Sequence, residues 1–373
     1  MKFKWSLAIF APIYGFVVWV RNKLFDLNIL KSEDFDVPVI SVGNVAVGGT
    51  GKTPHIEYLI SILSREYRIA VLSRGYKRKS KGYILACENS SAEEIGDEPY
   101  QIKRKFPNIT VAVDADRRRG IRNLIEIMPE IEVILLDDAF QHRYVTPLIS
   151  VLLTDYNRML YDDALLPLGR LREPASARYR ANAIIVTRCP DNISPIDRRI
   201  LIKRLELYPF QHLFFTATTY GNIVPLSKNI GGEKVLLKNI KHDARILAVS
   251  GIANPNPFDN YLRTVGVNIE TIHFSDHHDF TTQDIRLIEH NFLRMKTLSP
   301  HIYIITTEKD AARLVGKELP DTIKDNIYVL PISVVFTKFD NCDFDKYIKD
   351  SIFANRRIGK KPSDYKINNG GYG

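Results

Sequence analysis

Cysteine is scarce in this sequence of 373 residues, which contains only Cys87, Cys189 and Cys342. The three lie far apart, form no C-x-x-C pair and are odd in number. Neither a disulfide framework nor a zinc site is therefore indicated. This pattern is typical of a protein that works in a reducing compartment.

A hydrophobic run long enough to cross a membrane is also missing, and residues 5–20 come nearest to one. These sixteen residues carry no charge, but Pro12 and Gly15 interrupt them and basic residues flank them. As a helix they would extend about 24 Å, which is less than the roughly 30 Å of membrane hydrocarbon. We expect a half-embedded interfacial helix. A buried helix and a secretory signal are the alternatives, although Arg21 and Lys23 stand where a cleavage site needs small residues.

Acidic residues are outnumbered by basic ones, which gives a net charge of +9. Such a charge attracts phosphorylated ligands, anionic lipid or nucleic acid, and composition alone does not choose among them. No RNA-binding or helix-turn-helix pattern is present, so nucleic acid is not an expected partner. A hydrophobic content of 45% can fill ordinary cores, which excludes general disorder.

From residue 37 onward, short apolar segments alternate with longer mixed segments, which predicts a parallel sheet with helices on its faces. Strands are expected at 37–42, 69–72, 110–113, 133–136, 149–153 and 183–186, and in a second unit at 246–249, 269–273 and 303–306. Ligands of such sheets gather at the carboxyl ends of the strands. The predicted ranges are 1–30 for a membrane-associated helix, 31–211 for the first α/β domain, 212–239 for a β-ribbon linker, 240–353 for a smaller α/β domain and 354–373 for a disordered tail.

A glycine-rich turn follows the first predicted strand and leads into a helix. Its residues are Gly48, Gly49, Thr50, Gly51, Lys52 and Thr53. In a P-loop, backbone N–H groups bind phosphate oxygens, the lysine neutralises the β/γ charge, and the threonine hydroxyl is a Mg²⁺ ligand. The first glycine of the usual pattern is Ala46 here. A chance glycine turn is the alternative.

Two further predicted strands end in acidic residues. Asp137 and Asp138 are placed to hold Mg²⁺ beside a P-loop, unless they form only an acidic turn. Gln141 and His142 follow within reach of a transferred phosphoryl group. Asp116 precedes a cationic run and suits a general base, with a helix N-cap as the alternative.

Polar loops supply the remaining candidates. Arg74 with Tyr76, and Arg172 with Glu173, suit an anionic substrate that carries a ring, with nonspecific contact to lipid or nucleic acid as the alternative on charge alone. In the second unit His277 is a candidate to orient a catalytic carboxylate across a cleft, and a buried structural histidine is its alternative. Glu308 and Asp310 resemble loops that read a nucleotide base, with a capped helix start as the alternative. Each of these seven residues lies in one of four short polar segments.

Taken together, the motifs resemble the tetraacyldisaccharide 4'-kinase family, the lipid A 4'-kinases of Gram-negative inner membranes. The resemblance spans nearly the whole chain. It rests on the glycine-rich turn and on residues 73–76, 96–99, 116–117, 137–142, 171–174, 276–277 and 307–310. It is far more specific than a P-loop alone. The family often has glycine where this chain has Ala139, a difference that changes no chemical group.

The resemblance implies an ATP- and Mg²⁺-dependent kinase that phosphorylates the 4'-hydroxyl of a tetraacylated glucosamine disaccharide 1-phosphate. It implies a P-loop NTPase-type parallel sheet domain and a smaller α/β domain joined by a two-stranded β-ribbon. The amino-terminal helix is then expected to dip into the cytoplasmic leaflet of the bacterial inner membrane, with no oligomer required. By matching position, Asp116 becomes the general base and His277 its partner. Thr53, Asp137 and Asp138 fall on magnesium positions, and Lys52 on the phosphate-contacting lysine.

A membrane-bound P-loop ATPase switch is the main rival from another functional class. Such proteins commonly carry a second lysine just before the glycine pair, where this chain has Val47. That difference disfavours a nucleotide-sandwich dimer. A switch would hydrolyse ATP without a sugar-lipid acceptor, which separates the two hypotheses experimentally.

Overall fold

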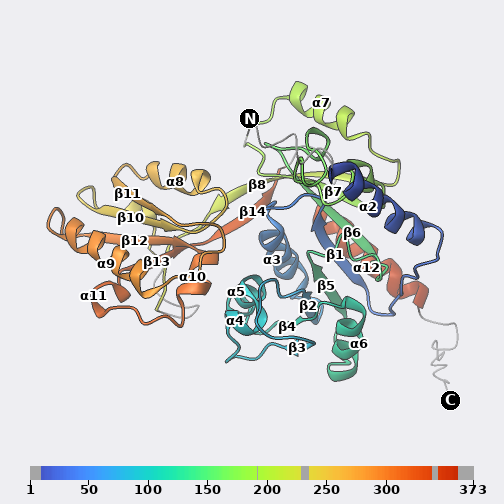
Figure 1. Ribbon diagram of the computed structural model, residues 1–373, viewed down its shortest axis with the longest axis horizontal. Helices are drawn as coiled ribbons and strands as arrows, with labels where there is room; N and C mark the ends of the chain where they lie inside the picture. The colour runs from blue at the N-terminus through green and yellow to red at the C-terminus, as the bar shows by residue number, and fades with distance from the viewer. Residues whose placement is uncertain (1–9, 191, 228–234, 338–342, 360–373) are drawn as a thin grey trace, which may run out of the picture.

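The computed structural model describes residues 10–190, 192–227, 235–337 and 343–359. Two α/β units make up the molecule, a larger one around a nine-stranded sheet and a smaller one around a five-stranded sheet (Figure 1). Because both are mixed α/β units with largely parallel sheets, the predicted fold class is confirmed at that level.

The larger sheet has the strand order β14-β8-β7-β6-β1-β5-β2-β4-β3. Its strands are β1 (Val39–Asn44), β2 (Ile69–Ser73), β3 (Ile84–Leu85), β4 (Thr110–Val113), β5 (Val133–Asp137), β6 (Ile149–Asp155), β7 (Ala183–Thr187), β8 (His212–Tyr220) and β14 (Ile332–Phe336). Each strand predicted between residues 37 and 186 is present. Strand β1 lies between β5 and β6 and is parallel to both, so its carboxyl end is central in the sheet.

Helices cover both faces of this sheet. They are α2 (Phe10–Asp26), α3 (Lys52–Leu63), α4 (Ala92–Ile95), α5 (Asp97–Lys105), α6 (Arg117–Ile127), α7 (Pro195–Leu205) and α12 (Phe344–Gly359). One face packs its apolar residues against α3, α5 and α12. The other packs against α6 and α7 in two separate clusters. The central strands are therefore buried on both sides, which is why they appear in the sequence as continuous apolar runs.

The smaller unit has the strand order β11-β10-β12-β13-β9. Its strands are β9 (Val224–Pro225), β10 (Arg245–Ser250), β11 (Asn268–His273), β12 (Ile302–Thr307) and β13 (Ile327–Leu330). Its helices are α8 (Asn256–Arg263), α9 (Thr282–Lys296), α10 (Glu308–Leu314) and α11 (Asp321–Lys324). The three strands predicted for this unit are β10, β11 and β12.

The chain returns to the larger unit before it ends, which corrects the predicted domain ranges. Strand β14 pairs antiparallel with β8 in the larger sheet, and Phe344, Ile348 and Ile352 of α12 pack into the larger core. Range 240–353 is thus not one domain. Although β14 and α12 follow the smaller unit in sequence, their apolar residues are buried in the larger unit. Range 212–239 is not a ribbon by itself, since β8 pairs with β7 and β14.

The predicted tail is partly helical. Helix α12 continues to Gly359, so residues 354–359 are ordered in a helix. The rest of the predicted tail lies outside the described residues.

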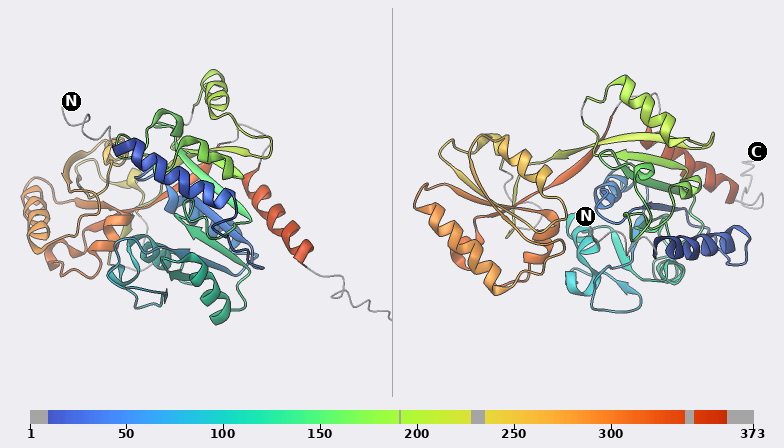
Figure 2. Two further views of the ribbon diagram at one scale, coloured as in Figure 1. Left: turned by 45° about the vertical axis from the view of Figure 1, so that its right-hand side comes forward. Right: turned by 45° about the horizontal axis from the view of Figure 1, so that its top comes forward.

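Helix α2 lies on the outside of the larger unit (Figure 2). Phe16 and Trp19 are more than half exposed on it, at 63% and 54%. No helix among the described residues is long and apolar enough to span a bilayer. Residues 1–9, which include the start of the predicted interfacial helix, lie outside the described residues.

Candidate active site

The turn between β1 and α3 has the backbone of a phosphate-binding loop. Gly48 and Gly51 adopt positive φ angles of 107° and 87°, which residues with a Cβ rarely adopt. Gly51 is the N-cap of α3, so the free N–H groups of Lys52 and Thr53 open the helix. A helix start of this kind binds anions. Ala46 forms an antiparallel bridge with Leu171 instead, so no glycine is required there.

Asp138 is held between two cations at the end of β5. Its carboxylate lies 3.6 Å from Lys52 Nζ and accepts hydrogen bonds from Arg172 of 2.8 and 3.2 Å. Burial raises the pKa of Asp138, but the positive charges of Lys52 and Arg172 outweigh it and hold the pKa at about 2. Asp138 is therefore ionised at neutral pH.

Asp137, its neighbour, is fully buried and differs in electrostatics. Burial, followed by the negative charges of Glu98 and Asp138, raises the pKa of Asp137 to about 7. Ser73 donates a hydrogen bond of 3.2 Å to Oδ2, while Oδ1 is buried without a partner. An unpaired buried carboxylate oxygen is suited to a cation, so the residues present fit Mg²⁺.

A larger metal cluster is not part of this site. Within the described ranges, no group of three or more His, Cys, Asp or Glu side chains is placed to hold a metal ion. Mg²⁺ in phosphoryl-transfer sites does not need one, because substrate phosphates and water complete a shell that begins with one or two carboxylates.

Asp116 is the N-cap of α6. Its carboxylate accepts a 3.0 Å bond from the Arg118 N–H and pairs with the Arg118 guanidinium at 3.1 Å. These bonds to Arg118, with the side-chain bond foremost, lower the pKa of Asp116. Its partners in the described chain do not include His277. The Asp116–His277 pair implied by the family resemblance is therefore not formed. Asp116 instead caps α6, which was the alternative to a role as general base.

His277 of the smaller unit instead contacts Asp97 of the larger unit. Its Nδ1 lies 3.4 Å from Asp97 Oδ2 and 3.1 Å from Arg313 Nη2. Arg313 also pairs with Asp97 at 2.8 Å. Burial raises the pKa of Asp97, but the His277 hydrogen bond and the Arg313 charge outweigh it and leave the pKa below its ordinary value.

Asp97 is a functional candidate that sequence reasoning missed, because it starts a helix and does not follow a predicted strand. Its segment, residues 96–99, contributed to the family resemblance but received no role. Its neighbour Glu98 lies close enough to Asp137 to raise the pKa of that carboxyl. The start of α5 thus faces the P-loop carboxylates on one side and the smaller unit on the other.

The loop after β2 also contacts His277 of the smaller unit. Arg74 is exposed, and Tyr76, 60% exposed, places its ring 5.7 Å from the His277 ring. Gly75 has a φ of 67°, and a Cβ there would approach Ile95 O to 2.9 Å. A glycine is therefore required to bring this basic loop against the end of α4.

Comparison with known proteins bears on this arrangement. The LpxK family, described as tetraacyldisaccharide-1-P 4'-kinase, matches residues 3–352. The chain belongs to this family. A tetraacyldisaccharide 4'-kinase of Phocaeicola vulgatus is 53% identical over 357 residues, covering 95% of this chain and 96% of the relative. The enzyme of that name from Flavobacterium johnsoniae is 45% identical, covering 92% and 96%.

A solved structure extends the comparison to the fold. It is described as an "apo" form of LpxK from Aquifex aeolicus in complex with ATP. The TM-score is 0.72 at 30% identity, over 94% of this chain and 98% of that one. The family predicted from the motifs is confirmed, and with it a kinase of lipid A biosynthesis.

In this LpxK-family kinase, α2 is hydrogen-bonded to the loops after β5 and before β7. Tyr14 Oη donates to the Arg172 carbonyl at 2.8 Å, and Arg21 donates to the Gln141 carbonyl at 2.8 Å. Asn22 donates to the Glu173 carboxylate at 3.3 Å. Three predicted substrate-binding residues thus contact the helix that presents apolar side chains outward.

The side chains of these loop residues are also engaged. Gln141 donates to the Asn44 carbonyl at 2.8 Å, and buried Glu173 pairs with Arg180 at 2.7 Å. Burial and the charge of Arg117 lower the pKa of His142 to about 4, so its ring is neutral at neutral pH.

Glu308 and Asp310 hold the smaller unit together and link it to the larger one. Glu308 pairs with Lys105 of α5 at 2.8 Å, and Asp310 accepts a 2.9 Å bond from the Gly251 N–H. Thr307 caps α10 by accepting from the Asp310 N–H. The capped helix start that was weighed as the alternative is therefore present.

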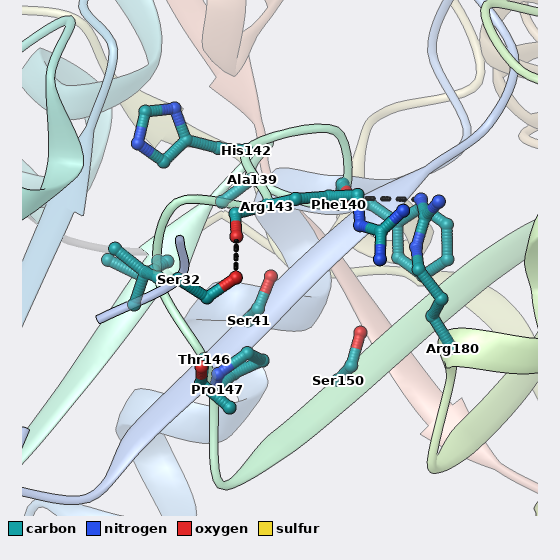
Figure 3. A pocket seen from close by; sticks show the side chains of 12 residues that line it. Ser32, Ser41, Ala139, Phe140, His142, Arg143, Thr146, Pro147, Ser150 and Arg180 are labelled. Carbon is teal, nitrogen blue, oxygen red and sulfur yellow. Dashed lines mark hydrogen bonds between the residues drawn. The ribbon is translucent and has the colours of Figure 1, made fainter. Parts of the chain in front are cut away.

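A cavity of about 150 Å³ lies under the loop after β5, lined in part by Phe140, His142 and Arg180. Figure 3 shows Ser41 and Ser150 on its floor, pointing from neighbouring strands toward that loop. Lys52 and Thr53 do not line it, so the cavity is separate from the P-loop.

Proposed function

We propose that this kinase transfers the γ-phosphate of ATP to the 4'-hydroxyl of a tetraacylated glucosamine disaccharide 1-phosphate. Residues 48–53 bind the triphosphate through backbone N–H groups, and Lys52 neutralises its β/γ charge. The positive φ angles in the turn, the free start of α3 and the ATP complex of the Aquifex aeolicus relative support this assignment.

Thr53, Asp137 and Asp138 are the residues that would hold Mg²⁺. When bound, the ion neutralises charge on the transferring phosphoryl group. Asp138 is already ionised, whereas Asp137 must lose its proton before it binds a cation. The chain's own contribution is to keep the two carboxylates at one strand end, with Lys52 and Arg172 beside them.

Asp97 is the group best placed to accept the proton of the attacking hydroxyl, with His277 as its orienting partner. The observation that carries this assignment is the contact of Asp97 with His277 beside Glu98 and Asp137. Its low pKa keeps Asp97 unprotonated at neutral pH. A weak base suffices, because catalysis of phosphoryl transfer is mainly positioning and charge neutralisation. Asp116 is the competing candidate and is tested against it below.

The acceptor enters from the cytoplasmic leaflet, along α2. The outward side chains of α2 suit the acyl-chain boundary of a bilayer. Arg74, Tyr76, Gln141, Arg172 and Glu173 then lie around the sugar, on loops bonded to α2 or facing His277. No oligomer is required for this arrangement.

Transfer of radiolabel from [γ-³²P]ATP to purified tetraacylated disaccharide 1-phosphate tests the proposal. We expect labelled lipid with the natural chain and a loss of about 100-fold or more in K52A, since a charge clamp on the phosphates is removed. Mg²⁺ chelation should abolish the signal. Hydrolysis of ATP at the same rate without the acceptor would contradict the proposal and favour an ATPase switch.

A further inference from the structure

The carbonyl groups of the phosphate-binding loop are held from behind by side chains that no motif marks. Arg188, which follows β7, donates to the Gly49 carbonyl. Thr187 Oγ1, at the end of β7, donates to the Thr50 carbonyl at 3.0 Å. The His55 ring on α3 bonds to the Gly51 carbonyl at 2.7 Å. Three successive carbonyls are thus each bonded to a side chain.

The direction of these carbonyls determines the direction of the neighbouring amides. A peptide unit is planar and trans, so its N–H group points away from its C=O group. Fixing the carbonyls of Gly49, Thr50 and Gly51 therefore aims the N–H groups of Thr50, Gly51 and Lys52 the opposite way. In the described chain, the N–H groups of Thr50 and Gly51 have no partner of their own. They are free for an anion.

The three side chains are themselves fixed. Asp155 pairs with Arg188 at 2.6 Å, and Thr187 is 1% exposed. Since a carbonyl only accepts hydrogen bonds, His55 Nδ1 carries the proton, and its Nε2 accepts from Thr216 Oγ1 at 3.1 Å. Burial lowers the pKa of His55 to about 4, which keeps this neutral form at working pH.

We propose that Thr187, Arg188 and His55 are positioning residues that hold the P-loop amides toward the triphosphate before nucleotide binds. Thr216 belongs to β8, which pairs with β14 in the larger sheet. Strands β8 and β14 form the connection through which the chain passes to the smaller unit and returns from it. His55 thereby links the loop to that connection. The proposal rests on the proposed site of ATP binding and adds the residues that prepare it.

The test compares T187V with T187S, because valine keeps the shape of threonine but lacks the donor. We expect T187V to raise KM and Kd for ATP about 2- to 10-fold, the range for one hydrogen bond, with the acceptor KM unchanged. T187S should restore ATP binding. T219V is the matched control, since among the described residues the Thr219 hydroxyl bonds to Ser333 of β14 and not to the P-loop.

Two results would overturn the proposal. One is an ATP affinity in T187V equal to that of the natural chain. The other is an equal rise in both KM values with a lower melting temperature, which would indicate general damage. H55N keeps a donor near the Nδ1 position and H55L does not, so H55N should bind ATP more tightly than H55L. Failure of the proposed function itself would appear as absent label transfer in the natural chain.

A second surface feature is independent of the P-loop. Helix α7 is apolar on two sides: Leu201 and Leu205 are buried in the larger unit, but Ile196 and Ile200 are 70% and 50% exposed. Tyr208 and Phe210 follow it, stacked on each other and also exposed. Figure 1 shows α7 projecting at the upper edge of the larger unit.

The same surface is basic and lies next to α2. Arg199 and Lys203 of α7 are exposed. The C-terminal ends of the two helices are bridged by adjacent residues: Tyr179 donates to Asp26 of α2 at 2.7 Å, and Arg178 donates to the Leu205 carbonyl of α7 at 2.8 Å. Exposed apolar side chains among basic ones are typical of helices that bind anionic bilayers.

We infer that α7 is a second contact with the anionic leaflet that α2 is proposed to face. The inference rests on the proposed membrane approach of the acceptor. Basic side chains are attracted to an anionic bilayer surface, and isoleucines gain free energy by burial in it. Helix α7 would therefore strengthen the membrane binding proposed for α2.

Co-sedimentation with phosphatidylglycerol vesicles tests α7. I196E/I200E should lower vesicle binding about tenfold, whereas L287E/L293E, at exposed leucines of α9 in the smaller unit, should not. Label transfer in detergent micelles should be unchanged in both variants, which checks that both are folded. Natural-level binding by I196E/I200E, or equal binding of the natural chain to phosphatidylcholine vesicles, would overturn the inference.

Discussion

Helices α5 and α6 both begin near Asp137, and each has an aspartate at its start: Asp97 is the first residue of α5, and Asp116 is the N-cap of α6. At α6, Asp116 caps the helix and pairs with Arg118 two residues later. At α5, Asp97 pairs with Arg313 and His277 of the other unit. The partner of Asp116 thus belongs to the same helix, whereas the partners of Asp97 belong to the other unit. Asp116 caps the start of α6, while Asp97 joins the two units next to Glu98, which lies near the Asp137 carboxylate.

The two aspartates also differ in exposure. The Asp116 side chain is 39% exposed and the Asp97 side chain 24%. Both have a lowered pKa, and burial opposes the lowering in both. For Asp116 the bond to Arg118 is the largest effect on the pKa, whereas for Asp97 burial is the largest single effect and the contacts with His277 and Arg313 together outweigh it. Proximity to a strand end alone does not single out the proposed general base. Asp97, which contacts His277 and Arg313 of the smaller unit, is the residue that we propose for this role.

The largest expected contrast is in turnover. D97N should lower the rate of label transfer about 100-fold or more, as expected for loss of a general base. D116N should change it less than about threefold, because asparagine also caps helices well. Single-turnover transfer with saturating ATP measures both. A large loss in D116N with near-normal D97N would reverse the comparison.

A double-mutant cycle with His277 sharpens the contrast. H277A should lower turnover about 10-fold or more on its own, because Asp97 loses its orienting partner. Added to D97N, it should have little further effect, since residues that act as a unit are non-additive. Added to D116N, it should keep its full effect. Additive losses in the D97N background would separate His277 from Asp97.

The pH dependence of Mg²⁺ binding tests the effect of Glu98. With the pKa of Asp137 near 7, the carboxyl is protonated below that pH and must release a proton to bind the ion. Affinity should rise as pH increases toward 7, about tenfold per unit, and level off above it. E98Q removes a negative charge that raises the pKa of Asp137. The Mg²⁺ affinity of E98Q should therefore stop rising at a lower pH than that of the natural chain. D116N is the control and should follow the natural profile.

The smallest expected effect is on stability. D116A removes the N-cap of α6 and should lower the free energy of unfolding by about 1 kcal/mol. D116N should leave it nearly unchanged. Urea unfolding monitored by circular dichroism measures both. A normal stability in D116A would mean that the capping contact with the Arg118 N–H has no role in holding α6.

Local patterns were sufficient to predict the parallel strands and the P-loop. Buried parallel strands are continuous apolar runs, and a glycine-rich turn before a helix needs only its own residues. The return of β14 and α12 to the larger unit was not predictable in this way. Nothing in residues 332–336 states which sheet they join, because pairing with β8 depends on the whole fold.

The candidate site was predicted in part for the same reason. Lys52, Asp137 and Asp138 come together because strand ends of one sheet meet. The partner of His277 was missed, because Asp97 lies 180 positions away and at a helix start. Thr187 and His55 were missed because their bonds run to backbone carbonyls, which leave no sequence signal.

A crystal structure with a non-hydrolysable ATP analogue, Mg²⁺ and the acceptor would decide between Asp97 and Asp116. We expect the triphosphate in the loop of residues 48–53 and the 4'-hydroxyl oxygen within about 3.2 Å of the Asp97 carboxylate, with His277 behind it. A hydroxyl bound to Asp116 and remote from Asp97 would rule out Asp97 as the general base.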